Sequence, residues 1–260
     1  MLLTAIKVKL AAMVVVAGLN TDEMKDISPA MKSTLEQLAA DQKNPEKDVN
    51  ASFTDALTKI RELADAGDKD ANYALGRWTA QGAVQGANVN QTIAFYKTAA
   101  DKGQIAAKAE LGQIYLQAFS QDPEKLKEGV ELIKEAEAGG NNSARRLLAN
   151  FHLAGLGGVE RSAAKAEQLL LKGSEAGDGE ATLGLFQLYT AGVGGPAGNI
   201  LKDDKKALQY LEKAADQGNA EAMRTLGARY FNGDQATGGG TPLVEKNPEK
   251  AMEMFKKSAE

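Results

Sequence analysis

The sequence predicts an all-α protein, a solenoid of about six helix-pair repeats. The first observation is a pattern, A-x-x-x-L-G-x-x-Y-x-x-G, whose copies are spaced 36 to 41 residues apart. The second is another pattern, K-A-x-x-Y-x-x-x-A-A-x-x-G, which follows each copy of the first and closes on a glycine. The two patterns are registered on different residues yet give matching periods, which chance does not produce. The closing glycines are Gly67, Gly103, Gly140, Gly177 and Gly218.

The first pattern predicts the first helix of each pair. In its fullest copy Ala222, Leu226 and Tyr230 recur four apart, which places them on one helix face. Gly227 carries no side chain, so the paired helix can pack close to it. Other copies are centred on Leu75, Leu111, Leu148 and Leu185, with a weak copy at Leu38.

The second pattern predicts the second helix. Ala207, Tyr210 and Ala214 share one face, and Gly218 can take a positive φ that ends the helix. Pro123 and Pro248 suit the first turn of such a helix. Because one helix pair cannot bury its apolar face alone, neighbouring pairs must stack.

The repeat period divides the chain into units of roughly 28–67, 68–103, 104–140, 141–177, 178–218 and 219–260. In the first unit, Ser28 and Pro29 are expected to start a helix, and Asp41–Asn50 to form a polar loop. Ser52 with Asp55 resembles a capping box that opens the next helix. The sequence stops inside the last repeat, so we expect either further repeats or self-association at the C-terminus.

Residues 1–18 resemble a secretory signal peptide. Lys7 and Lys9 precede an uncharged run, Leu10–Leu19, in which Ala17 and Gly18 are small. The run is too short for a good membrane span, so no span is expected in the mature chain. The chain is then periplasmic or secreted if the leader is cleaved, and cytoplasmic otherwise. A cytosolic leader and an uncleaved anchor are the alternatives.

The repeat positions quoted above resemble the Sel-one-like repeat family, a relative of the tetratricopeptide repeats, over roughly residues 28 to 260. The resemblance implies a right-handed superhelix of antiparallel helix pairs. It also implies an adaptor that binds proteins or peptides, as family members typically do in secreted, periplasmic and organelle-lumen settings. One bacterial branch carries a cysteine pair in each repeat and is linked to penicillin-like compounds and cell-wall fragments. This chain has no cysteine, which puts that chemistry in doubt.

Residues that could carry catalysis are scarce. The absence of cysteine excludes thiolate nucleophiles and cysteine zinc sites, and the net charge of −4 is mixed along the chain, which argues against nucleic acid. The single histidine, His152, fills the repeat's tyrosine position, so we interpret it as a packed, hydrogen-bonded residue. Trp78 is interpreted as a packing residue and not a ligand platform. No cofactor or metal site is expected, and we predict that the chain is not an enzyme.

The predicted binding site follows from the resemblance, which implies that the first helices line a concave face. Its outward positions combine arginine, which pairs with carboxylates, with amides that bond a peptide backbone, so an extended peptide is the expected ligand. A solvated face without a ligand is the alternative. The predicted residues are Tyr73, Arg77, Gln113, Arg146, Asn150, Gln187, Arg224 and Asn232.

The sequence therefore predicts an exported adaptor or scaffold for an unidentified protein or peptide. A binder of cell-wall fragments or small ligands with weak hydrolase activity is one alternative, and a self-assembling structural protein is another. Two glycine-rich loops, Val193–Asn199 and Asp234–Thr241, are interpreted as flexible connections, with recognition loops as the alternative.

Overall fold

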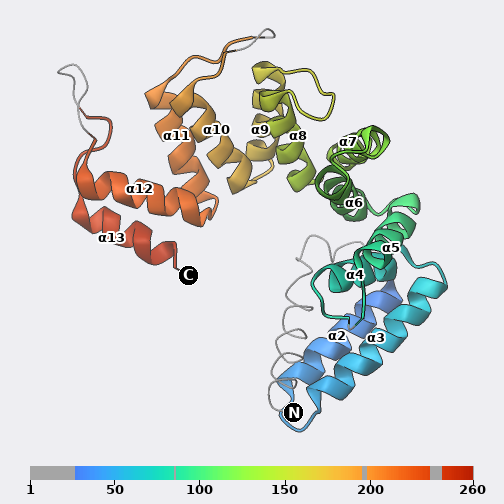
Figure 1. The fold of residues 1–260 in the computed structure, drawn as a ribbon. Coiled ribbons are helices and arrows are strands. Elements are labelled where there is room, and N and C mark those ends of the chain that lie inside the picture. Colours follow the sequence, from blue (N-terminus) through green and yellow to red (C-terminus); the bar gives the residue numbers. More distant parts are fainter. Residues whose placement is uncertain (1–26, 85, 195–197, 235–241, 260) are drawn as a thin grey trace. The chain divides into compact units, whose positions relative to one another are not determined.

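The fold is a helical repeat solenoid, seen in a computed structural model that describes residues 27–84, 86–194, 198–234 and 242–259 (Figure 1). Within these ranges twelve helices form six pairs, and the only extended pairing is an isolated bridge between Val193 and Ile200. The predicted leader lies outside the described residues, as do 195–197 and 235–241 of the two glycine-rich loops. None of the helices in these ranges is both long enough and apolar enough to cross a membrane.

The chain divides into two compact units, Met1–Gly139 and Gly140–Glu260. The helices of the first unit are α2 (Pro29–Lys43), α3 (Val49–Asp65), α4 (Lys69–Ala80), α5 (Val89–Asp101), α6 (Ile105–Ala118) and α7 (Pro123–Ala138). Those of the second unit are α8 (Asn142–Ala154), α9 (Ala163–Glu175), α10 (Gly179–Ala191), α11 (Asp204–Asp216), α12 (Ala220–Asn232) and α13 (Pro248–Lys257).

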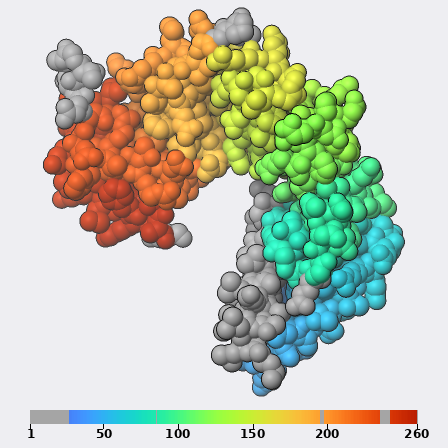
Figure 2. Space-filling view, in the orientation of Figure 1, coloured from blue at the N-terminus to red at the C-terminus, as the bar shows by residue number. Residues whose placement is uncertain are grey.

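Within each unit every helix packs against the helices before and after it in the chain. In the space-filling view the consecutive segments of a unit lie directly against one another (Figure 2). The apolar faces meet as the repeat patterns predict: one core cluster of the second unit joins Leu183 of α10, Leu211 of α11 and Leu226 of α12. Each pair is thus buried by its neighbours, as stacking of repeats requires.

Most predicted helix starts are confirmed. Ser28 caps α2 ahead of Pro29, and Pro123 and Pro248 occupy the first turns of α7 and α13. Asp203 caps α11, its carboxylate accepting hydrogen bonds from the first backbone N–H groups.

The predicted start of α3 is wrong. The helix begins at Val49, capped by Asp48, whose carboxylate accepts hydrogen bonds from the Asn50 and Ala51 amides at 2.9 and 3.4 Å. Ser52 therefore lies within the first turn of the helix. Because α2 continues to Lys43, the expected polar loop shrinks to residues 44–48.

The glycines do what the patterns predict. All five closing glycines have positive φ; that of Gly218 is 85°. A Cβ added at Gly76 of α4 would lie 2.6 Å from the ring of Tyr96 on α5, closer than atoms can approach. Glycine at this position thus permits the close approach of the paired helices.

Polar side chains tie the N-termini of successive first helices together. In the first unit the buried carboxylate of Asp70 accepts hydrogen bonds from the Ser28 amide at 3.1 Å and the Gln104 side chain at 3.0 Å. In the second unit Asn219 donates to Glu180 at 2.7 Å. Three of these residues cap the N-termini of their helices: Ser28, Gln104 and Asn219. Each hydrogen bond therefore joins the start of one first helix to the start of the next.

Candidate binding groove

One of the predicted outward positions lies three residues before the pattern glycine in the first helix of each pair. In several repeats the side chain at this position faces the next helix pair and not solvent. Tyr73 is buried in a core cluster that includes Leu111 of the next pair, with its ring 6.0 Å from that of Tyr96, in contrast to the expected outward orientation. Leu183, at the same position of α10, is also buried. Arg146 is half-buried and pairs with Asp178, the cap of α10, at 2.5 Å. Arg224, at the same position of α12, is exposed.

The remaining predicted residues are more accessible. Arg77 is half-buried, and its guanidinium lies 5.8 Å from the centre of the Tyr73 ring. Gln113 is half-buried, while Asn150, Gln187 and Asn232 are exposed. A binding role for any of them stays a prediction.

The histidine and the tryptophan have structural contacts. His152 is half-buried, not fully within the core, and its Nδ1 lies 2.8 Å from the Glu160 carbonyl oxygen. Trp78 is buried, with its ring 5.7 Å from that of Phe53, so its interpretation as a packing residue is confirmed.

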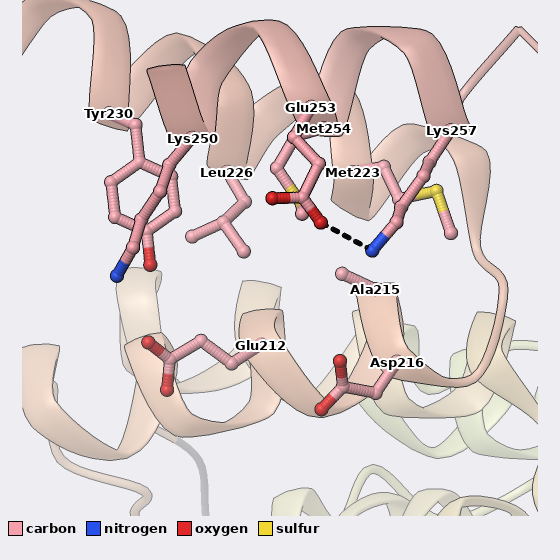
Figure 3. Close-up of a pocket in the computed structure, with 10 residues that line it drawn as sticks. All are labelled: Glu212, Ala215, Asp216, Met223, Leu226, Tyr230, Lys250, Glu253, Met254 and Lys257. Atoms are coloured by element: carbon pink, nitrogen blue, oxygen red, sulfur yellow. Dashed lines mark hydrogen bonds and ion pairs between the residues drawn. The ribbon is translucent and has the colours of Figure 1, made fainter. Parts of the chain in front are cut away.

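A groove that the sequence patterns did not predict lies in the second unit, between α11 and α13, with α12 beneath it. Its volume is about 550 Å³, and it is open to solvent (Figure 3). The lining residues are Glu212, Ala215 and Asp216 of α11, Met223, Leu226 and Tyr230 of α12, and Lys250, Glu253, Met254 and Lys257 of α13.

The floor of this groove is apolar and its walls are charged. Leu226 projects into the space between the two walls, and Met223 and Met254 line the groove beside it (Figure 3). On the α13 wall Lys257 donates to Glu253 at 2.7 Å, and the Lys250 ammonium lies 5.4 Å from the centre of the Tyr230 ring. An apolar floor with polar groups at its edges is the usual composition of a ligand site.

One residue that lines the groove differs from its counterpart in the preceding repeat. In the preceding repeat Tyr210 stacks on Tyr189, with ring centres 5.6 Å apart and planes 12° apart. The last repeat has Met254 at the position of Tyr210 in the pattern, so the Tyr230 ring has no aromatic partner there. Comparing these two positions in the sequence would have revealed the difference.

The chemistry of this lining suits binding. It contains no serine, histidine or cysteine to act as a nucleophile or to be activated by a neighbouring base. Among the described residues no group of three or more potential metal ligands comes together. The groove offers carboxylates, ammonium groups, thioethers and one phenol, which recognise a ligand through charge and apolar contact.

Solved structures with the same fold come from several bacteria. A Sel1 repeat protein from Oxalobacter formigenes is 22% identical, with a TM-score of 0.68 over 88% of this chain and 83% of that one. A protective antigen of uropathogenic Escherichia coli is 24% identical, with a TM-score of 0.66 over 88% of this chain; the match spans only 45% of the antigen. An immunity protein from Pseudomonas aeruginosa is 16% identical, with a TM-score of 0.55 over 90% of this chain and 84% of that one.

No curated protein matches the sequence significantly. The Sel1 repeat, in contrast, matches four separate stretches, residues 69–104, 142–178, 180–219 and 220–260. These stretches cover more than half of the chain and coincide with helix pairs of the structure. The chain therefore belongs to the Sel1 repeat family.

Proposed function

We propose that this chain is a protein- or peptide-binding scaffold and that the groove between α11 and α13 is one of its binding surfaces. The observation that carries the proposal is the groove itself, which combines an apolar floor with charged walls. Sel1 repeats typically mediate protein interactions, which supports the same reading. The similar solved structures support the fold alone, since each is less than 25% identical.

Closing the groove tests the proposal. In Met254→Tyr the new ring is expected to lie against Tyr230 as Tyr210 lies against Tyr189, so the fold should be kept while the groove is filled. Peptides selected from a random phage-displayed library on the unmodified protein should lose binding to Met254→Tyr. Enrichment by panning and the affinity of resynthesised peptides measure the effect.

Met252→Tyr is the matched control. It adds the same side chain to the same helix at an exposed position outside the groove lining. Selected peptides should bind it as they bind the unmodified protein. Peptides that bind all three proteins equally would place recognition outside the groove, and the absence of any enriched peptide would contradict a peptide-binding function.

We also propose that the chain is exported, on the composition of residues 1–18 alone. A full-length fusion to alkaline phosphatase, which is active only after export from the bacterial cytoplasm, should be active when expressed in a bacterium. A variant in which polar residues replace the uncharged run Leu10–Leu19, while Lys7 and Lys9 are kept, should lose that activity. An active fusion after this replacement would contradict a signal function for the segment.

A further inference from the structure

The α11 wall of the groove carries two carboxylates, Glu212 and Asp216, that form no ion pair with any other described residue. Glu212 and Asp216 are both exposed and line the groove one helical turn apart (Figure 3). Among the residues that line the groove, the one ion pair joins Glu253 and Lys257 of the opposite wall. Glu212 and Asp216 are therefore available to a ligand.

The opposite wall compensates for these charges only in part. Lys257 is already paired with Glu253, and Lys250 is placed over the Tyr230 ring. The lining holds three carboxylates, Glu212, Asp216 and Glu253, against two ammonium groups, so its formal charge is 2 − 3 = −1. A cationic ligand group is thus favoured on the α11 side.

The apolar floor beside the acidic wall favours a ligand that carries an apolar group. Met223 and Met254 have unbranched thioether side chains, which adapt to ligands of varied shape. The volume, about 550 Å³, lies in the range of pockets that enclose drug-sized ligands. It therefore takes a few neighbouring side chains of a peptide and not a folded domain.

The spacing of the two carboxylates favours arginine over lysine. Residues four apart on a helix are neighbours, about 5–6 Å between their Cβ atoms. A planar guanidinium presents several N–H donors in a fixed fork and can bond both carboxylates at once. The compact ammonium of lysine is a point charge and matches such a pair less well.

We propose that the groove binds an extended peptide segment in which an arginine is adjacent to a large apolar residue. The arginine lies between Glu212 and Asp216, and its apolar neighbour covers Met223, Leu226 and Met254. This assignment rests on the proposed peptide-binding function and adds the chemical class of the ligand.

The test uses three synthetic peptides of one design, each capped at both ends, fluorescently labelled, and seven residues long with two leucines flanking the central position. The central residue is arginine, its uncharged isostere citrulline, or glutamate. Fluorescence anisotropy should show binding in the order arginine, citrulline, glutamate, with about a five- to tenfold loss from arginine to citrulline. The loss should diminish as salt is raised, because exposed charges are screened.

The protein variants locate the effect. The double variant Glu212→Gln, Asp216→Asn should bind the arginine peptide about as weakly as the unmodified protein binds the citrulline peptide. Glu175→Gln, which changes the carboxylate at the position equivalent to Asp216 in the preceding repeat, should leave binding unchanged. Circular dichroism confirms that each variant is folded.

The outcomes separate this inference from the proposed function. Equal binding of the arginine and citrulline peptides would overturn the role of the acidic wall. If none of the three peptides binds, while library peptides still bind the unmodified protein and not Met254→Tyr, the arginine assignment is overturned and the groove remains the binding site. If the library yields no binding peptide either, the proposed peptide-binding function is itself contradicted.

Discussion

At the scale of single residues, the phenol of Tyr189 shows how burial and a carboxylate act together. Its hydroxyl donates a hydrogen bond to Glu167 of α9, and its ring stacks on Tyr210 and lies with its centre 4.9 Å from the Lys206 ammonium. Burial first, and then the bond to Glu167, raises the pKa of Tyr189 well above its ordinary value of about 10.

This shift predicts a loss of stability in alkali. Above about pH 10 the unfolded state releases the Tyr189 proton while the folded state retains it, so the free energy of unfolding falls as pH rises. Tyr189→Phe should reduce the fall measured by urea unfolding between about pH 9 and 11. An identical pH dependence in the variant would contradict the assignment.

Two of the predicted arginines have different environments. The guanidinium of Arg146 pairs with Asp178, whose side chain is only 6% exposed, whereas Arg224 is exposed and contributes to no ion pair among the described residues. Arg146→Ala should lower the free energy of unfolding by about 1–2 kcal/mol, because it leaves a buried carboxylate without its cation.

Arg224→Ala is the control and should change stability by less than about 0.5 kcal/mol. Urea unfolding followed by circular dichroism measures both variants. Equal effects would show that the Arg146 ion pair adds nothing to stability. The expected difference means that a binding defect of an Arg146 variant can be interpreted only after its stability is known.

At the scale of helices, the packing of a pair depends on its glycine. Gly76→Ala would place a methyl group 2.6 Å from the buried ring of Tyr96, which cannot move aside, so α4 and α5 must separate. The expected cost is about 1–3 kcal/mol, measured as a lower midpoint in urea.

Gly184→Ala is the matched comparison, because the nearest atom there is the end of the Leu170 side chain, at 3.0 Å. That side chain can shift, and alanine favours helix by about 1 kcal/mol over glycine, so the variant should be close to neutral. A Gly76→Ala protein as stable as Gly184→Ala would contradict the role of glycine in the close contact.

Helix ends were predictable from the sequence at positions where only one residue type suits the backbone. Proline in a first turn and glycine after a second helix each have a single steric reason, and the structure confirms them. The start of α3 was not predictable in this way, since Asp48 and Ser52 can both accept hydrogen bonds from backbone amides. The helix packs against both α2 and α4, contacts that its own sequence does not show.

At the scale of the whole molecule, the repeat period predicted the fold and the number of helix pairs because every repeat obeys the same packing constraint. The burial of Tyr73 was not predictable from its own helix, since the neighbouring pair covers it. The groove likewise is lined by three helices at once, so no single helix of the sequence indicates it.

The shared backbone conformation of the closing glycines predicts that a repeat can be excised. Deleting residues 178–218 joins Gly177 to Asn219, so a positive-φ glycine still precedes a helix cap. The shortened protein should keep its helicity per residue in circular dichroism. Deleting 178–198 alone removes α10, and with it the contact of Leu183 with the core around Leu211 of α11, so helicity and cooperativity should fall.

The same glycine junctions make the repeat a module that can be gained or lost, with consequences beyond the fold. Excision of 178–218 would bring α9 to the place of α11 beside α12. Leu171 would then stand where the intact chain has Glu212, and Glu175 where it has Asp216. Such a deletion would keep the architecture but remove half of the acidic wall. A change in the number of repeats would therefore also change which ligands the groove prefers.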